Sequence, residues 1–176
     1  MLRTAFYALL CATLLVQPAC KKADEGSEVS YIYDFQIPAG TVFFHEFKTD
    51  LPSSRDGWLA QIGITAEQLK SVQVRYVRYT IVNSNDRFDW IDRAFLKIAK
   101  YDFNNPNPNY FEIGYNLQVP TNQGGTLDLA PDETELKDYF LADRFRLSGK
   151  FINRTNAVNP TTIQVRLALG FTVFKN

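Results

Sequence analysis

Cysteine and histidine are scarce in this chain of 176 residues, which contains two cysteines and one histidine. Two cysteines exclude a disulfide-dense scaffold, which needs several bridges. A basic excess is also missing, because 19 Lys and Arg residues balance 19 Asp and Glu residues. Since surfaces that bind DNA or RNA are normally basic, we predict no nucleic-acid partner. The hydrophobic share of 45% predicts a folded protein, and the length suits one domain plus a targeting segment.

An apolar run long enough to span a bilayer is missing as well. The run from Ala5 to Val16 is almost purely apolar, but a transmembrane helix needs roughly 20 such residues. The run follows a short positive start with Arg3, and its length is typical of the apolar region of a secretory signal, about 7–15 residues. We therefore predict a signal peptide over residues 1–19.

A cysteine stands where this signal ends, in the sequence Gln17-Pro18-Ala19-Cys20. With a small residue before the cysteine, the segment resembles the precursor of a bacterial lipoprotein, whose cysteine becomes the lipidated N-terminus. Gln17 replaces the usual aliphatic residue, as in the relaxed signals of Bacteroidota lipoproteins. The resemblance implies lipid attachment at Cys20, with residues 20–28 as the lipidated cysteine and a polar tether. The alternative is an ordinary cleaved signal followed by an unmodified cysteine.

Acidic residues after the cysteine bear on the location of the protein. Asp24, Glu25 and Glu28 loosely resemble the acidic patch that can mark export to the cell surface in the Bacteroidota, although Lys21 and Lys22 dilute it. We expect an outer-membrane lipoprotein exposed on the cell surface. The alternative is an anchored protein that faces the periplasm.

Strands dominate from residue 29 onward, because apolar and polar residues alternate with the period of a strand that buries one face. In one long strand the apolar phase slips between Tyr76 and Val77, which predicts a β-bulge or burial on both faces. About eight strands are predicted, over residues 29–36, 41–48, 71–83, 94–101, 111–119, 126–129, 145–153 and 163–173.

Two short helical segments interrupt the strands. Residues 65–68 have the spacing of a capping box, which predicts a single turn. Residues 131–141 predict a short helix, since acidic residues fill the first turn and an apolar stripe follows. Together the elements predict an all-β fold over residues 29–176, with one antiparallel β-sandwich of jelly-roll or other Greek-key type.

The order of these elements also resembles that of Bacteroidota surface lipoproteins in which a β-sandwich follows the lipidated cysteine. In those proteins a Leu-Lys-Asp-Tyr helix precedes the last two strands, and Leu136-Lys137-Asp138-Tyr139 stands in that place here. The resemblance implies a fold and no activity.

Residues with catalytic or metal-binding chemistry are few. His45 begins a sequence like the helix motif of zinc proteases, but Thr49 stands where the second histidine must be. A strand face shared with Phe43 and Phe47 predicts a packed histidine in place of a metal ligand. The sequence contains no nucleophile elbow and no phosphate-binding loop. We therefore predict no catalytic residue, no metal and no cofactor.

Three loop carboxylates form the most site-like stretch of the sequence, namely Asp86, Asp89 and Asp92. Such carboxylates can bind calcium, and two of them can act as acid and base in a glycosidase. Arg87 and Arg93 are close enough in sequence to pair with them, so surface ion pairs are the alternative interpretation.

Trp58 and Trp90 are candidates for sugar binding, because an aromatic face can stack on a sugar ring. Core packing is the alternative, since aromatic residues are common throughout this sequence and strands favour them.

The leading hypothesis is a lipid-anchored cell-envelope protein whose β-sandwich is a non-enzymatic binding or structural module. A surface glycan-binding module is the alternative, and a glycoside hydrolase that uses a carboxylate pair is the third hypothesis. The expected partners are the membrane, through the lipid at Cys20, and a glycan or another envelope protein.

Overall fold

The computed structural model describes residues 26–105, 108–155, 157 and 159–175. The predicted signal peptide, Cys20 and most of the tether therefore lie outside the described residues. Among the described residues, no helix has the length and apolar content that crossing a membrane requires.

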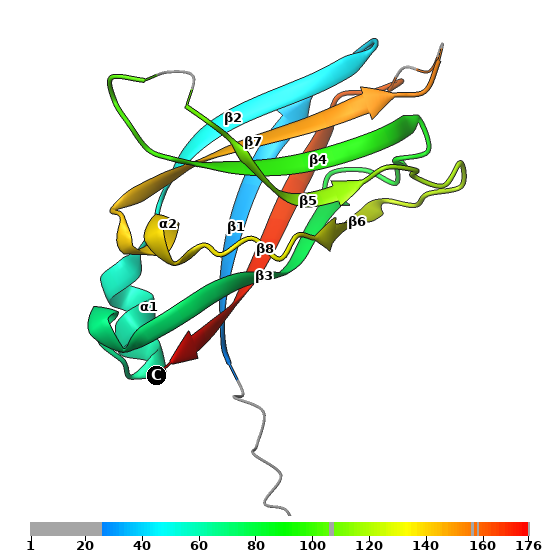
Figure 1. Cartoon of the computed structure of the whole chain (residues 1–176). Helices are drawn as coiled ribbons and strands as arrows, with labels where there is room; N and C mark the ends of the chain where they lie inside the picture. Colours follow the sequence, from blue (N-terminus) through cyan, green and yellow to red (C-terminus); the bar gives the residue numbers. More distant parts are fainter. Residues whose placement is uncertain (1–25, 106–107, 156, 158, 176) are drawn as a thin grey trace, which may run out of the picture.

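Eight strands form the body of the protein and confirm the all-β prediction (Figure 1). Most strands place alternate residues in the core and the residues between them toward solvent, while some also bury consecutive residues. Their bounds are β1 Ser27–Ile37, β2 Phe44–Pro52, β3 Leu69–Ile81, β4 Ile91–Lys100, β5 Phe111–Asn116, β6 Thr126–Pro131, β7 Arg144–Asn153 and β8 Ile163–Lys175.

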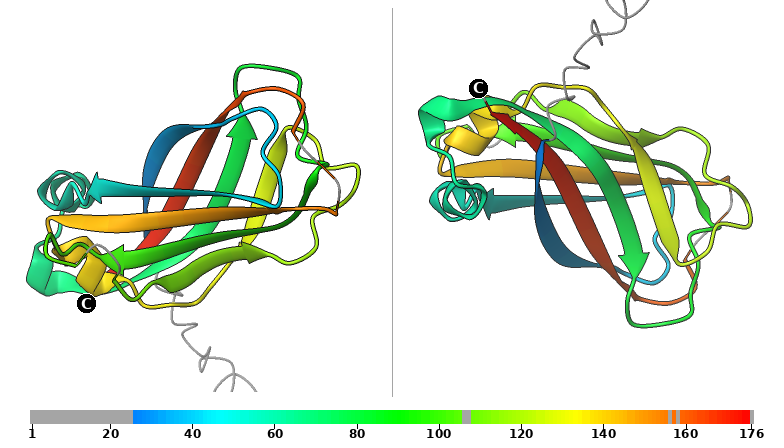
Figure 2. Two further views of the ribbon diagram at one scale, coloured as in Figure 1. Left: turned by 90° about the horizontal axis from the view of Figure 1, so that it is seen from above. Right: turned by 90° about the horizontal axis from the view of Figure 1, so that it is seen from below.

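The strands run in the order β1-β8-β3-β6-β5-β4-β7-β2, and all neighbours pair antiparallel. Only the residue pairs Gly114–Pro131 and Tyr115–Ala130 join β5 to β6. The sheet therefore folds there into two layers, β1-β8-β3-β6 and β5-β4-β7-β2, whose strands cross in Figure 2. Two interleaved four-stranded layers of this order are a jelly roll.

Aromatic rings fill much of the space between the two layers. Phe35 of β1 stacks on Phe47 of β2 with ring centroids 4.1 Å apart. At the other end of the core, Phe140 meets Phe171 edge to face at 4.5 Å and Trp58 at 5.6 Å. Because such ring contacts are favourable beyond the area they bury, they fix how the layers sit on each other.

A bulge in β3 confirms the predicted slip of its apolar phase. The register of β3 against β8 shifts between Val74 and Tyr76. Val72 and Val74 are buried before the shift, and Val77 and Tyr79 are buried after it. The extra residue thus keeps both halves of the strand pointing their apolar side chains into the core.

The helices differ in part from the prediction. The turn over residues 65–68 is present as a 3-10 helix, Ala66–Gln68, in which the Gln68 side chain accepts a hydrogen bond from the Thr65 backbone N–H at 2.9 Å. A further helix, α1 Arg55–Ile62, lies just before it and was not predicted. Its ends are set by Ser54 and Gly63, which both have left-handed backbone angles.

The second helix is shorter than predicted. Pro131 is the last residue of β6, and α2 covers only Lys137–Leu141. The segment between them is held along β3, because the Leu136 backbone N–H donates to the Val72 carbonyl oxygen at 2.9 Å. The Glu135 carboxylate in turn accepts from the Val72 backbone N–H at 2.9 Å, so residues 135 and 136 are tied to β3 just before the helix begins.

Candidate functional site

His45 lies in β2 as a packed histidine, which is what its strand position predicted. Its ring is parallel to that of Phe35 with centroids 6.4 Å apart. Burial lowers the pKa of the His45 imidazole, and Nε2 is buried without a hydrogen-bond partner among the described residues. Phe43 does not share its strand face as predicted, because β2 begins at Phe44.

The three loop carboxylates do not converge on one point. Asp89 lies 3.4 Å from Arg87, and Asp92 lies 3.3 Å from Arg93, as the ion-pair interpretation predicted. Asp86 accepts hydrogen bonds from two neighbouring hydroxyl groups, which lower the pKa of its carboxyl. Within the described residues, no three His, Cys, Asp or Glu side chains are grouped so that they could hold a metal ion.

Both tryptophans are core residues. Trp58 is 4% exposed and Trp90 is 6% exposed. The Trp58 indole N–H donates to the Ser53 carbonyl oxygen at 3.1 Å. Neither indole offers an open face to a sugar ring, so the structure supports the core-packing interpretation for both residues.

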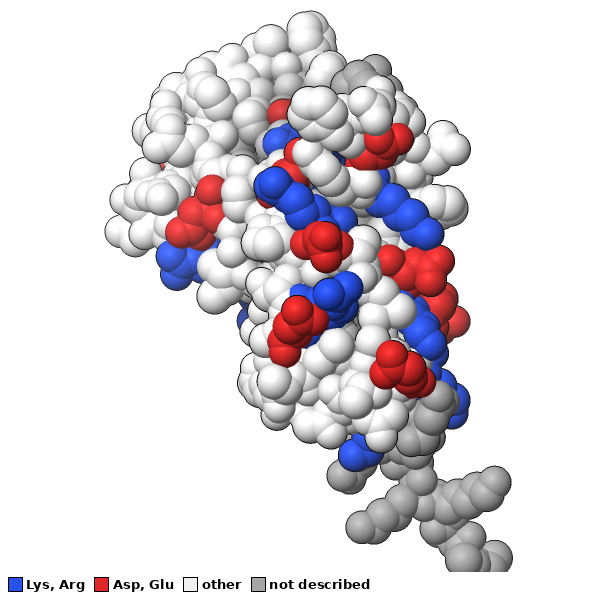
Figure 3. Space-filling model, turned by 90° about the vertical axis from the view of Figure 1, so that its left-hand side faces the viewer, with Lys and Arg blue, Asp and Glu red and all other residues white. Residues whose placement is uncertain are grey.

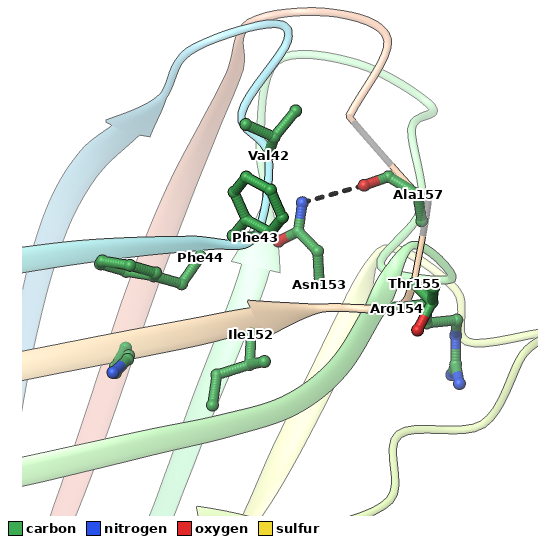
Figure 4. Close-up of a pocket in the computed structure, with 9 residues that line it drawn as sticks. Val42, Phe43, Phe44, Ile152, Asn153, Arg154, Thr155 and Ala157 are labelled. Carbon is green, nitrogen blue, oxygen red and sulfur yellow. Dashed lines mark hydrogen bonds between the residues drawn. The ribbon is translucent and has the colours of Figure 1, made fainter.

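Sequence reasoning missed a hollow at one end of the sandwich, which we call the distal hollow (Figure 4). It has a volume of about 500 Å³ and is formed by the β1–β2 loop, the end of β7 and the residues that follow β7. Its lining residues are Val42, Phe43, Phe44, Lys150, Ile152, Asn153, Arg154, Thr155 and Ala157.

Three consecutive apolar side chains of this hollow face solvent. Val42 is 51% exposed, Phe43 is 79% exposed and Phe44 is 51% exposed. Phe43 also has a φ of 65°, in the left-handed region that bulky residues rarely occupy. Backbone strain of this kind persists only where the surroundings impose it, and it is concentrated at functional sites.

Two buried asparagines hold the loop that carries these side chains. The Asn153 side-chain amide donates to the Thr41 carbonyl oxygen at 2.8 Å, and the Asn153 backbone N–H donates to the Phe43 carbonyl oxygen at 2.8 Å. The Asn159 side chain donates to the Pro38 carbonyl oxygen at 2.5 Å and accepts from the Thr41 N–H at 2.9 Å. The strained loop is therefore a fixed surface.

The floor of the distal hollow contains an unsatisfied acceptor. The Asn153 side-chain N–H groups donate to the carbonyl oxygens of Thr41 and Ala157, which fixes the orientation of the amide (Figure 4). Its Oδ1 atom is buried and has no hydrogen-bond partner among the described residues. A buried acceptor without a partner costs stability.

The two basic residues of the hollow differ in their surroundings. The Arg154 guanidinium already has partners within the protein. It donates to the backbone oxygens of Asp89 and Val119 and lies 3.6 Å from the Asp92 carboxylate. Lys150 makes no ion pair with a residue that the structure describes, and its Nζ lies 4.7 Å from the centre of the Phe44 ring. Lys150 is therefore a cation at the rim of an apolar surface.

The charge distribution elsewhere is mixed. On the face shown in Figure 3, basic and acidic side chains lie next to one another. Across the sheet, cross-strand ion pairs such as Asp34–Arg166 at 2.9 Å and Arg78–Asp128 at 2.6 Å join side chains of opposite charge. Such exposed pairs contribute little to stability and leave no strong field to attract a ligand.

The β1–β2 loop, which forms part of the distal hollow, lies at the opposite end of β1 from Ser27 (Figure 1). Ser27 at the start of β1 pairs with Val173 near the C-terminus, and Ile37 at its end pairs with Ile163. The hollow begins just beyond Ile37. The signal that could have identified it is the run of three apolar residues after the Pro38 turn, because a strand cannot bury three consecutive side chains on one face.

Strand order and site geometry thus define an all-β protein of jelly-roll type with an apolar hollow at one end. No protein-family model matches the sequence, and neither does any curated protein. Among solved structures, the decameric BFDV capsid protein is similar at 8% identity with a TM-score of 0.41, covering 85% of this chain and 98% of that one. Desmodium yellow mottle tymovirus is similar at 10% identity with a TM-score of 0.27, covering 88% of this chain and 91% of that one. With such low identities and scores, the likeness supports no inference about function.

Proposed function

We propose that this protein is a lipid-anchored cell-envelope protein whose jelly roll is a non-enzymatic binding module. The single observation that carries the binding role is the distal hollow, where three exposed apolar side chains are held in a fixed loop. The lipid anchor is proposed from the sequence, since a signal-like run ends at Ala19-Cys20. An outer-membrane location with the module facing the cell exterior is part of the proposal.

The proposed anchor and the hollow are compatible in their dimensions. β1 has 11 residues and extends about 35 Å from Ser27, where the tether joins it, to Ile37 beside the distal hollow. The segment from Cys20 to Gly26 reaches at most about 22 Å when fully extended. Such a tether is too short for the module to invert, so the distal hollow would point away from the anchoring membrane.

The anchor is tested by replacing the cysteine. We expect Cys20→Ser to abolish labelling by an alkyne fatty acid and to release the protein from the membrane fraction. Cys11→Ser is the matched control, because Cys11 lies inside the apolar run and its replacement keeps the proposed site intact. Labelling that persists in Cys20→Ser, or is lost in Cys11→Ser, would contradict the proposed site. Protease shaving of intact cells then distinguishes a surface-exposed module from a periplasm-facing one.

The binding role is tested with a photocrosslinking amino acid placed at position 43 in living cells. We expect a discrete adduct of defined mass from this position. Ile32 is the control position, since it is 66% exposed but lies on the outer face of β1. Equal adducts from both positions, or none from position 43, would count against a specific site at the distal hollow.

Glycan binding is a second candidate, favoured by a smaller hollow on the outer face of the β5-β4-β7-β2 layer. This hollow of about 350 Å³ combines the Phe95 and Tyr110 rings with several charged side chains, including Lys97 and Glu112. Ring faces and many hydrogen-bonding groups are what a sugar requires, and the Tyr110 hydroxyl is buried without a partner among the described residues. Glycan-array binding that is lost in Phe95→Ala but kept in Phe43→Ser would favour this site. Turnover of a glycoside panel, abolished when Asp86, Asp89 or Asp92 becomes Asn, would instead support the hydrolase hypothesis.

A further inference from the structure

The chemistry of the distal hollow selects an apolar occupant. Val42, Phe43 and Phe44 supply its exposed surface, and Ile152 contributes from β7. A sugar ring carries a hydroxyl on most of its carbon atoms, and each hydroxyl buried without a partner costs roughly 1–3 kcal/mol. The hollow has too few polar groups to satisfy them, so hydrocarbon side chains fit it better than a glycan does.

The size of the hollow selects a short segment. Its volume of about 500 Å³ is within the range of sites that hold one small ligand, roughly 300–1,000 Å³. A stable interface between two folded surfaces buries about 1,600 Å², which needs a wide flat face. A few side chains from one extended segment fill a hollow of this size, whereas a second folded domain does not.

The charge and the preformed shape add two constraints on the occupant. Lys150 at the rim has no carboxylate partner among the described residues, so it can pair with a carboxylate of the ligand. Asn153 and Asn159 hold the loop before any ligand arrives. Because little ordering is left for the moment of binding, a small contact area can give useful affinity.

We infer that the distal hollow binds a short apolar segment of another envelope protein, one that carries a carboxylate beside its apolar side chain. The inference rests on the proposed function and names its partner. The apolar side chain packs against Phe43 and Phe44. The carboxylate, from an acidic side chain of the partner, pairs with the Lys150 ammonium. This contact would lie at the end of the sandwich opposite Ser27, the first residue of β1.

The test is a selection of phage-displayed random peptides against the full-length Cys20→Ser protein. We expect enriched peptides to combine an aromatic or aliphatic residue with a neighbouring Asp or Glu. Binding of one such synthetic peptide should fall about tenfold or more in Phe43→Ser and in Lys150→Glu. Ile32→Ser, which removes an exposed apolar side chain elsewhere, should leave binding unchanged. A cooperative thermal unfolding transition in each variant would show that all of them are folded.

Charge reversal makes the inference specific. Lys150→Glu should prefer a peptide in which the acidic residue is replaced by Lys, restoring at least part of the lost affinity. No enrichment, or enriched peptides that bind Phe43→Ser and Lys150→Glu as well as the parent protein, would overturn the inference. Adducts from position 43 in cells would in that case leave the proposed function standing with an occupant of different chemistry.

Discussion

Phe43 allows a direct test of whether the distal hollow is built for binding or for stability, through two substitutions at one position. The side chain is 79% exposed, so about 40 Å² of a ring of roughly 200 Å² is buried. At about 25 cal/mol per Å², losing that burial costs about 1 kcal/mol. Phe43→Ala should therefore lower the free energy of unfolding by about 1 kcal/mol, because alanine keeps the left-handed strain.

Phe43→Gly removes the same ring and relieves the strain at a φ of 65°. Left-handed backbone costs a residue with a Cβ about 1–2 kcal/mol. The greater freedom of glycine in the unfolded protein offsets about 0.5–1 kcal/mol of this gain. We expect the free energy of unfolding of Phe43→Gly to lie within about 0.5 kcal/mol of that of the parent protein and to exceed that of Phe43→Ala. Both variants should nevertheless fail to bind.

Urea denaturation followed by circular dichroism measures both variants on the Cys20→Ser background. Gly40→Ala is a control in the same loop, since Gly40 has a φ of 72° and open space around its Cβ position, so that only strain is added. If the Phe43→Gly and Phe43→Ala variants are equally stable, residue 43 does not keep its left-handed backbone conformation in solution. If both variants lose more than about 2 kcal/mol, Phe43 is a packing residue and the reasoning about the hollow fails.

Two further predictions concern the core. A Cβ at Gly149 would overlap the buried Phe47 ring, whereas one at Gly170 would overlap the partly exposed Tyr76 ring. Gly149→Ala should lower the free energy of unfolding, measured by urea denaturation, by about 1–3 kcal/mol. Gly170→Ala should lower it by at least about 1 kcal/mol less, because only the Tyr76 ring can move into solvent. Equal losses in the two variants would refute this reasoning. Burial depresses the folded-state pKa of His45 below its ordinary value of 6.5, so the unfolded protein binds the proton more tightly. The stability that depends on neutral His45 should be fully present above pH 6.5 and should be lost as the pH falls below it, by at most about 1.4 kcal/mol per pH unit. Urea titrations from pH 5 to 7.5 should show no such loss in His45→Gln.

The strands could be predicted because alternation in the sequence maps directly onto the two faces of each strand. In β8, Ile163, Val165 and Leu167 are at most 1% exposed, as their spacing predicted. Helix α1 could not be predicted in this way, because only Trp58 and Leu59 of its residues are buried and they form no stripe. Its position depends on turns at its ends and on packing against the core, which are tertiary effects.

The candidate site was less predictable than the fold, because exposure depends on where a strand begins. Alternation through Phe43, His45 and Phe47 predicted one shared face, but the left-handed turn at Phe43 breaks the period before β2 starts. The two tryptophans are candidates for sugar binding by their chemistry alone, since their sequence neighbours give no information on their burial. The residue type indicates which ligand a side chain could bind, but only the packing of the fold determines whether that side chain is accessible.

Phe43 combines three features that no other described residue has together. It is a large apolar side chain left in solvent, a residue with a Cβ in left-handed backbone, and an aromatic ring in a loop. Glycine would satisfy the backbone at this position at the loss of only about 40 Å² of ring burial, so the fold itself gives little reason for a ring here. Local departures of this kind are expected where a protein makes contact with something else. Trp58 and Trp90 show no such conflict, which is why the ring of Phe43 is the better indicator of where this protein binds.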